Sequence, residues 1–432
     1  MGKKLIDLKS GLGRNLAGFL IFILSILVHV FVNYGLRTTT DIGIGTTEYA
    51  AIANNISSGH GFVMVPGEEF ILWRPPFYIY LVAFFNKYFT HPFGAVFFLQ
   101  IILNALTCVL IYKIGEKIFD RRVGFFAALI LTCYPLFIIN SIRLMPEAVF
   151  TFLLSLFLFF FIGFFEKSGW KRVVILGILL GLSTLTKASI QFLPFFLGVY
   201  AVLWLRKRIQ LVPVLIRLIG VIIIMIGVIS PWTIRNYLFS NELIFVDTSG
   251  GYTFWIGNRI QSDGHDDDPL TKTEMDEVKK DVARILGMDY TPSFTLAKTA
   301  WASGENSKKL YQEGLRTIWN HPLQVGWISL KKIYRFWFLY VGKMGFRLQE
   351  LIWVIQGILI SIGLIGIGFS LKQRKAISPL ILIIAYFVLL HMMSTANIRY
   401  SMPVMPYMIL LTVFGVSQSR KYVLEKACEK KN

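Results

Sequence analysis

The residues best able to do chemistry are a few acids and cations that interrupt otherwise apolar segments. Residues 41–80, DIGIGTTEYAAIANNISSGHGFVMVPGEEFILWRPPFYIY, form the first long polar break after an apolar stretch. This break contains the carboxylates of Asp41 and Glu48 and the guanidinium of Arg74, and a further acid, Glu147, opens a later apolar segment. A carboxylate can take the proton from an attacking hydroxyl, and a cation can neutralise charge on a leaving group.

Each of the three acids also has an ordinary structural explanation. Glu48 or Glu147 could be a charge at a helix N-terminus, where the helix dipole favours an acidic residue. Asp41 could be a turn residue before Gly43. The residues alone therefore leave Asp41 and Glu48 as alternative candidates for a general base.

Basic residues near the predicted helix ends could bind an anion. For each of them the simpler alternative is that the side chain extends to lipid head groups. As a group they favour a phosphate-bearing lipid reactant, because arginine and lysine neutralise a phosphate as charge develops on it. These five cations are Arg74, Arg143, Lys187, Arg235 and Arg399.

The segments between these residues are apolar enough to cross a membrane. The chain has 432 residues, of which 55% are hydrophobic and 15% are aromatic. A helix needs about 20 apolar residues to cross a bilayer, and the alternating pattern of a barrel is absent. The sequence therefore predicts an all-α polytopic membrane protein with about ten spans. They are expected at 15–36, 92–113, 123–140, 148–165, 173–188, 190–205, 212–231, 350–371, 378–393 and 403–418.

The distribution of basic residues predicts the orientation of these spans. The net charge of +19 is concentrated beside alternate span ends, which is the positive-inside pattern and argues against a nucleic-acid partner. Both termini are therefore expected in the cytoplasm, with 37–91 and 232–349 on the opposite face. The first apolar stretch has no small-residue cleavage site, so we interpret it as a retained helix.

Three parts of the chain are expected. Residues 1–231 would form an N-terminal transmembrane catalytic module that includes the external loop 37–91, and residues 232–349 an external segment. Residues 350–432 would form the last helices and a basic cytoplasmic tail. Two stretches suit the membrane surface: 76–88 is apolar but too short to cross, and 311–346 mixes aromatic and basic residues.

Several stretches resemble membrane glycosyltransferases of the GT-C type, which use polyprenyl-phosphate sugars. That family includes protein O-mannosyltransferases and the aminoarabinose transferases of lipid A. The most specific stretch is SPWTIRNYLFSNELIFVDTSGGYTFWIGN at 230–258, and RYSMPVMPYMILL at 399–411 resembles the family's last span. The other stretches are 48–62 with 74–85, 142–154 and 180–194.

The resemblance implies a GT-C-like bundle with a large first external loop and an external active site. It implies inverting transfer of a hexose or pentose from a lipid phosphate to a hydroxyl acceptor on a protein, lipid or glycan. Arg74 and Lys187 match cations that contact the donor phosphate. Glu147 matches an acid of the family's second loop. There it would orient one of three groups: the general base, the side chain of Arg143, or a divalent metal ion. The resemblance leaves the metal requirement open.

The chain departs from the family at one place that matters for the reaction. Family members usually carry an acid about four positions before the tyrosine that matches Tyr49. Here that position is Gly45. The departure leaves the base open between Asp41 and Glu48, and it also suits a non-catalytic relative that only binds lipid-linked sugar.

Further residues are candidates for the substrate pocket. Tyr49 lies beside the candidate base, and the resemblance places Trp255 and Asn258 at the mouth of the cavity, where the indole could stack on a sugar. His60 lies in a glycine-flanked turn and is more typical of a loop than of a metal site. The run His265–Asp268 could bind a cation through oxygens, but it is more typical of a solvated loop.

We therefore expect a glycosyltransferase of a bacterial inner membrane. Its partners would be a polyprenyl-phosphate-linked sugar, membrane lipids and a hydroxyl acceptor. A nucleotide-binding phosphate loop, a C-x-x-C pair and an H-E-x-x-H motif are all absent from the sequence. The rival from another class is a secondary transporter or flippase, which would tend to show internal repeats that this sequence lacks.

Overall fold

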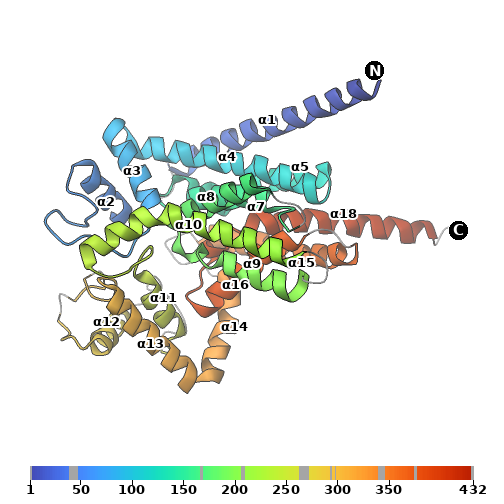
Figure 1. Cartoon of the computed structure of the whole chain (residues 1–432). Coiled ribbons are helices and arrows are strands. Elements are labelled where there is room, and N and C mark those ends of the chain that lie inside the picture. The colour runs from blue at the N-terminus through green and yellow to red at the C-terminus, as the bar shows by residue number, and fades with distance from the viewer. Residues whose placement is uncertain are drawn as a thin grey trace.

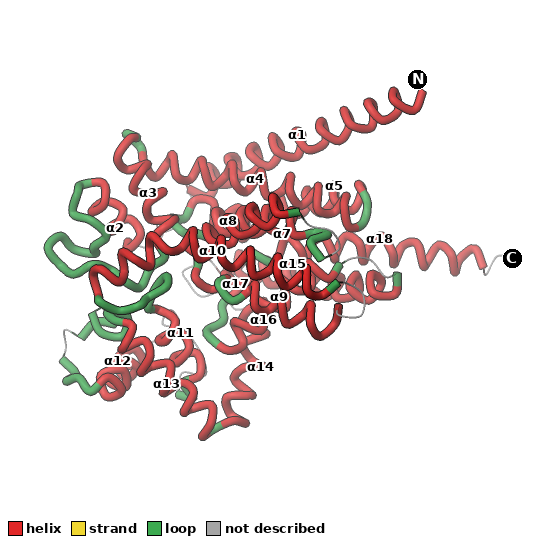
Figure 2. The backbone as a smooth tube through the Cα atoms, viewed as in Figure 1, coloured by secondary structure: helices red, strands yellow, loops and turns green. Residues whose placement is uncertain are grey.

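Helices make up most of the residues that the computed structural model describes (Figure 1). These are 2–37, 47–165, 169–205, 210–261, 272–291, 294–296, 298–338, 346–373 and 377–429. Within these ranges the extended backbone is limited to one isolated bridge, between Val63 and Phe70, and to short connections drawn as loops in Figure 2. The predicted all-α class is confirmed.

Long helices form the bundle. Among the described residues, four helices are long and apolar enough to cross a bilayer alone, at Asn15–Gly35, Pro92–Ile118, Leu211–Ser240 and Gln349–Lys372. The predicted count of about ten spans is not confirmed, because most of the other predicted spans form shorter helices. The long helices are α1 (Gly2–Arg37), α4 (Pro92–Ile118), α10 (Leu211–Ser240), α15 (Phe346–Lys372) and α18 (Met405–Glu429).

The predicted span 123–140 is a bent pair of helices. α5 (Arg121–Thr132) starts at an Asp120 cap whose carboxylate accepts the backbone N–H of Val123 at 2.9 Å. α6 (Pro135–Ile139) follows at 55°, because Pro135 has no N–H with which to continue the helix. The 3₁₀ turn η1 (Asn140–Ile142) then leads the chain towards Glu147.

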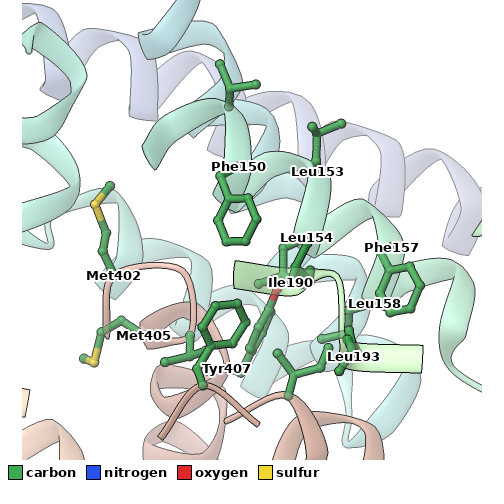
Figure 3. Packing of buried hydrophobic residues seen from close by; sticks show 14 of the residues in the cluster. Phe150, Leu153, Leu154, Phe157, Leu158, Ile190, Leu193, Met402, Met405 and Tyr407 are labelled. Carbon is green, nitrogen blue, oxygen red and sulfur yellow. The ribbon is translucent and has the colours of Figure 1, made fainter. Parts of the chain in front are cut away.

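Shorter apolar helices complete the centre of the bundle. Figure 3 shows Phe150, Leu154 and Leu158 of α7 packed near Ile190 and Tyr407 in the buried core. These shorter elements are α7 (Glu147–Phe161), α8 (Trp170–Thr186), η2 (Ala188–Ile190), α9 (Leu193–Tyr200), the π-helical turn η3 (Ala201–Leu205), α16 (Ser378–Met393) and α17 (Ile398–Ser401).

Glycines allow close helix contacts. A Cβ on Gly366 of α15 would lie 1.9 Å from the carbonyl oxygen of Leu411 on α18, and a Cβ on Gly124 of α5 would lie 2.3 Å from the carbonyl of Tyr112 on α4. Small residues at such crossings let backbones approach, which is the usual basis of helix packing in membranes.

The remaining helices gather at the end of the bundle away from both chain ends (Figure 1). α11, α12 and α13 share a second hydrophobic cluster that includes Tyr252, Val278 and Leu310. The division into residues 1–231, 232–349 and 350–432 stays a prediction; α10 itself continues past 231 to Ser240. The helices at this end are α2 (Thr47–Ser57), α3 (Pro76–Tyr88), α11 (Ser249–Asn258), α12 (Lys272–Leu286), α13 (Gly304–Asn320) and α14 (Pro322–Phe338).

Candidate active site

The first group of charged residues joins α2 to the segment before α3. Glu48 lies in the first turn of α2, where a helix N-terminal acid is expected, but its carboxylate turns towards Trp73 and Arg74. The Trp73 indole donates to Glu48 Oε1 at 2.6 Å, and Arg74 donates from Nε to Oε1 at 3.1 Å and from Nη2 to Oε2 at 2.7 Å. Both carboxylate oxygens are therefore engaged, in a two-point pair.

The electrostatics of Glu48 follow from these contacts. Burial by itself would raise the pKa of this carboxyl, but the charge and hydrogen bonds of Arg74 and the Trp73 donor outweigh it and hold the pKa below its usual value. Pro75 keeps the backbone after Arg74 extended, with φ −61° and ψ 142°, so the guanidinium is presented ahead of α3.

An acid that the sequence analysis did not single out lies near the same cation. Asp247 stands between α10 and α11, and its Oδ1 accepts both the Ser249 N–H at 3.0 Å and the Ser249 hydroxyl at 2.7 Å. The neighbouring Thr248 N–H donates to the Leu72 carbonyl at 3.0 Å, which ties this loop to the segment carrying Arg74. In the sequence, Asp247 could have been recognised by its position inside the stretch 230–258, shortly before the start of α11.

Asp247 and Glu48 have opposite pKa shifts although both lie close to Arg74. Burial raises the pKa of Asp247, and the Ser249 hydrogen bonds and the Arg74 charge offset only part of that effect. Asp247 therefore binds a proton more readily than an ordinary aspartate, whereas Glu48 resists protonation.

The second group is a buried acid between two cations. Glu147 starts α7 and is only 1% exposed. Its Oε1 lies 3.2 Å from Lys187 Nζ, at the end of α8, and 3.2 Å from Arg399 Nε, on α17. Within the described part of the chain, Glu147 Oε2 is buried with no hydrogen-bond partner. Two cations thus share one carboxylate oxygen, and the group carries excess positive charge.

Aromatic rings hold these two cations in place. Lys187 Nζ lies 5.8 Å from the centre of the Phe150 ring and 5.3 Å from that of Tyr400, and Arg399 lies 5.3 Å from the same Tyr400 ring. Tyr400 stacks on His391 at 4.5 Å. Ring faces attract cations and limit their rotation, so the ammonium and guanidinium are pre-positioned.

Tyr49 connects the two groups. Its ring lies 5.6 Å from the Arg74 guanidinium and meets Tyr78 edge-to-face at 5.6 Å. Burial raises the pKa of its hydroxyl, and the charges of both groups act on it. The structure therefore brings the candidates Glu48, Tyr49, Arg74, Glu147, Lys187 and Arg399 into one region, with Asp247 at its edge.

Two of the candidate cations have other surroundings. Arg235 donates to the Ile71 carbonyl at 3.0 Å and lies among aromatic rings, the nearest being Trp232 at 4.5 Å. Arg143 is half-buried, and its own carbonyl accepts from the Gln100 amide at 3.0 Å.

The remaining candidates lie on α11 and in the loop between α2 and α3. His60 is exposed between Gly59 and Gly61, which both have positive φ, as expected for a loop residue. Trp255 is 4% exposed and lines a polar hollow of about 350 Å³. Asn258 is buried and donates to the Phe254 and Met393 carbonyls, so its amide ties α11 to the end of α16.

Some predicted residues fall outside the described part of the chain, namely Asp41, the Gly45 position and the run His265–Asp268. Among the described residues, no group of three or more His, Cys, Asp or Glu side chains could hold a metal ion. At the second group the described chain offers the carboxylate of Glu147, whose Oε2 has no hydrogen-bond partner among the described residues.

A family model gives the first comparison with known proteins. The model described as dolichyl-phosphate-mannose-protein mannosyltransferase matches residues 73–234. The matched segment begins at Trp73 and contains Arg74, Glu147 and Lys187. No curated protein matches the chain.

Solved structures give the second comparison. The oligosaccharyltransferase AglB from Archaeoglobus fulgidus, in complex with an inhibitory peptide and a dolichol-phosphate, has a TM-score of 0.53 at 14% identity, covering 96% of this chain and 52% of AglB. The apo form of the oligosaccharyltransferase from that organism has a TM-score of 0.57 at 15% identity, covering 97% of this chain and 52% of the oligosaccharyltransferase. ArnT from Cupriavidus metallidurans bound to undecaprenyl phosphate has a TM-score of 0.38 at 13% identity, covering 94% of this chain and 77% of ArnT. The chain spans about half the length of AglB, and the likeness to AglB confirms the expected membrane fold.

Proposed function

We propose that this chain, with its GT-C-type fold, is an integral membrane glycosyltransferase. It transfers a sugar from a polyprenyl-phosphate donor to a hydroxyl acceptor. The observation that carries the proposal is the buried Glu147, which shares one oxygen between Lys187 and Arg399 beside the Arg74–Glu48 pair. The match of residues 73–234 to a mannosyltransferase family supports the same activity.

The excess positive charge suits a lipid phosphate. Lys187 and Arg399 are held on aromatic faces at the ends of apolar helices, where a polyprenyl chain can lie in the bilayer. Their charge stabilises the phosphate more strongly once the sugar has left, since negative charge then accumulates on the leaving oxygen. Arg74 contributes a third cation, and Arg143 and Arg235 are secondary candidates for contact with the donor.

The reaction is a single displacement at the anomeric carbon. A bond forms between the acceptor oxygen and that carbon, the bond from the carbon to the phosphate oxygen breaks, and its electron pair stays on the phosphate. One displacement inverts the anomeric configuration. The hydroxyl proton passes to a carboxylate, for which Asp41 and Glu48 remain candidates and Asp247 is added by its position near Arg74.

We propose that Glu147 is a positioning residue. Its single shared oxygen keeps Lys187 and Arg399 close together despite their repulsion, and the charges of this group and of the Arg74–Glu48 pair both act on Tyr49. A divalent ion at the unpartnered Oε2 is an alternative use of the same carboxylate.

The location of the reaction is also a proposal. α2, which carries Glu48, lies at the end of the bundle opposite both chain termini (Figure 1), so basic cytoplasmic ends would place this part of the site at the external face of a bacterial inner membrane. A lipid-linked hexose or pentose would reach it sideways from the bilayer, and the acceptor would arrive from the external solution or the same leaflet.

The experiment is a transfer assay with the full chain in lipid. Purified protein would receive a panel of radiolabelled polyprenyl-phosphate sugars, with membrane extract as acceptor. Label that moves into protein, glycan or lipid supports the enzyme and identifies the acceptor class. Donor binding without transfer would favour a non-catalytic binder, which Gly45 makes worth testing, and the absence of both would favour a transporter or flippase.

A further inference from the structure

α13 and α14 meet in an elbow whose outer side is strongly apolar. The corner carries Trp319, which is 86% exposed, and Leu323, which is 88% exposed. No other large hydrophobic side chain in the described part of the chain is as exposed as these two. They lie on either side of His321 and Pro322, where the chain leaves α13 and starts α14.

The apolar surface continues along both helices at helical spacing. Residues four positions apart share one face of a helix, so the exposed side chains of each helix form a stripe. We call this surface the elbow stripe. It consists of Leu315 and Trp319 on α13 and of Leu323, Trp327, Leu330 and Tyr334 on α14, all exposed. Tyr311 lies at its edge, where its ring packs 4.4 Å from that of Phe254.

The opposite side of the elbow is fixed to the rest of the protein. A Cβ on Gly314 would lie 2.7 Å from the Phe254 ring, which shows how closely α13 approaches α11. On α14, Ile328 and Phe336 are buried, and the Phe336 ring stacks on His391 of α16 at 5.5 Å. The stripe therefore cannot turn inwards without loss of this packing, and it needs an apolar environment outside the described fold.

The composition around the stripe identifies that environment. The segment 304–338 contains six basic residues and two acidic ones, and its stripe is rich in Trp and Tyr. Lys331 lies beside the stripe, with its ammonium 6.0 Å from the Trp327 ring. Aromatic rings flanked by cations favour the head-group layer of a membrane, where the rings reach acyl chains and the cations meet phosphates.

The position of α14 agrees with this environment. α14 packs on α16, whose end carries the exposed Leu389 and Met393, so the apolar surface runs on from the bundle to the elbow. Figure 1 draws α14 across the direction of the long helices α10 and α18. A helix lying across the spanning direction at the edge of the apolar bundle is placed to lie in the plane of the bilayer surface.

We infer that the α13–α14 elbow is seated in the lipid head-group layer, with the elbow stripe buried in the boundary between head groups and acyl chains. Trp319 and Leu323 reach furthest into the lipid. On the opposite side of α14, Lys332 donates to the Met392 carbonyl at 3.1 Å and to the Asn258 amide oxygen at 3.3 Å. The seated helix thereby holds the end of α16, beyond which α17 carries Arg399, at a set depth relative to the bilayer.

The inference is tested by measuring depth in the membrane. Single spin labels would be placed at Leu323→Cys and, as matched control, at Asn320→Cys, an exposed position on the side of α13 that lines the polar hollow. The full chain, with Cys133 and Cys428 replaced, would be studied in nanodiscs of phosphatidylcholine and phosphatidylglycerol. We expect the label at 323 to be relaxed mainly by oxygen and the label at 320 mainly by a water-soluble nickel chelate, with a difference in nickel accessibility of about fivefold or more.

Two outcomes would overturn the inference. Equal nickel accessibility at both positions would place the stripe in water. Spin–spin broadening at 323 in nanodiscs that hold two copies, absent in those that hold one, would show that a second copy covers the stripe. A Trp319→Phe variant gives an independent measurement. If the Trp319 indole lies in the lipid, its removal should reduce the quenching of tryptophan fluorescence by brominated lipids. Unchanged quenching would contradict the placement of Trp319 in the lipid.

Discussion

Arg74 meets Glu48 through two separate contacts, Nε to Oε1 at 3.1 Å and Nη2 to Oε2 at 2.7 Å. The geometry uses the planar fork of arginine, and the Trp73 indole completes the carboxylate's partners at 2.6 Å. Glu48 is thereby suited to fix the direction of Arg74, and the same contacts make it a weaker proton acceptor than an unpaired acid.

Replacement of Arg74 by lysine should not be conservative. A lysine keeps the charge but cannot make the two-point contact with Glu48, so the cation loses its fixed direction. We expect Arg74→Lys to lower the transfer rate about 10²-fold, similar to the loss of one preorganised donor elsewhere. The exposed Arg316→Lys is the control and should retain wild-type transfer. Equal rates for both variants would remove Arg74 from the site.

Replacement of Lys187 should weaken binding of the donor phosphate. Lys187→Met removes one of the two cations at Glu147 and leaves that buried carboxylate to Arg399 alone. We expect the Kd for undecaprenyl phosphate to rise about tenfold or more, since a charged hydrogen bond contributes about 1.5–3 kcal/mol. Lys309→Met, at an exposed ion pair on α13, should leave the Kd unchanged.

The pH dependence of transfer separates Asp247 from Glu48. The pKa of Asp247 is raised, so its carboxylate is lost as pH falls through a value above 3.8, whereas the lowered pKa of Glu48 keeps that group charged. We expect Glu48→Gln to reduce the rate while keeping the acid limb of the pH–rate profile. Asp247→Asn should abolish that limb. An unchanged limb in Asp247→Asn would leave the acids of the first loop as the proton acceptor.

Lys332 should make stability depend on pH. Burial lowers the pKa of Lys332 from its usual 10.5 to about 7, with a smaller effect from the charge of Arg335. Between these two values the unfolded chain binds more protons than the folded one, so stability should rise with pH across this window and level off below it. The midpoint of thermal unfolding in detergent should show this rise, and Lys332→Met should show a flatter profile. Parallel profiles would mean that Lys332 stays charged in the folded protein.

Two glycines on the same helix test the contact between α15 and α18. Gly366→Ala would place a Cβ 1.9 Å from the Leu411 carbonyl, whereas a Cβ on Gly368 has open space. Overpacking typically costs about 1–3 kcal/mol, so Gly366→Ala should lower the unfolding midpoint clearly. Gly368→Ala should leave it unchanged or slightly raised, because alanine favours a helix. Equal midpoints would contradict the close packing.

Much of the fold could be predicted from the sequence because apolar runs specify helices locally. The expected start of a short helix at residue 76 and of a longer one at 92 agrees with α3 and α4. The break inside 123–140 was not predicted, although Pro135 marks it. The number of spans could not be settled from hydropathy, since α7 and α16 are apolar but short.

The candidate site divides in the same way. The sequence by itself determined which ionisable residues interrupt the apolar segments, because charge at membrane depth is costly and therefore conspicuous. Only the tertiary structure decided their partners: Glu147 meets Lys187 and Arg399 through three separate helices, and Asp247 approaches Arg74 because Thr248 bonds to Leu72. Such contacts depend on how helices pack and where loops cross, and neither is encoded in the local pattern of any one segment.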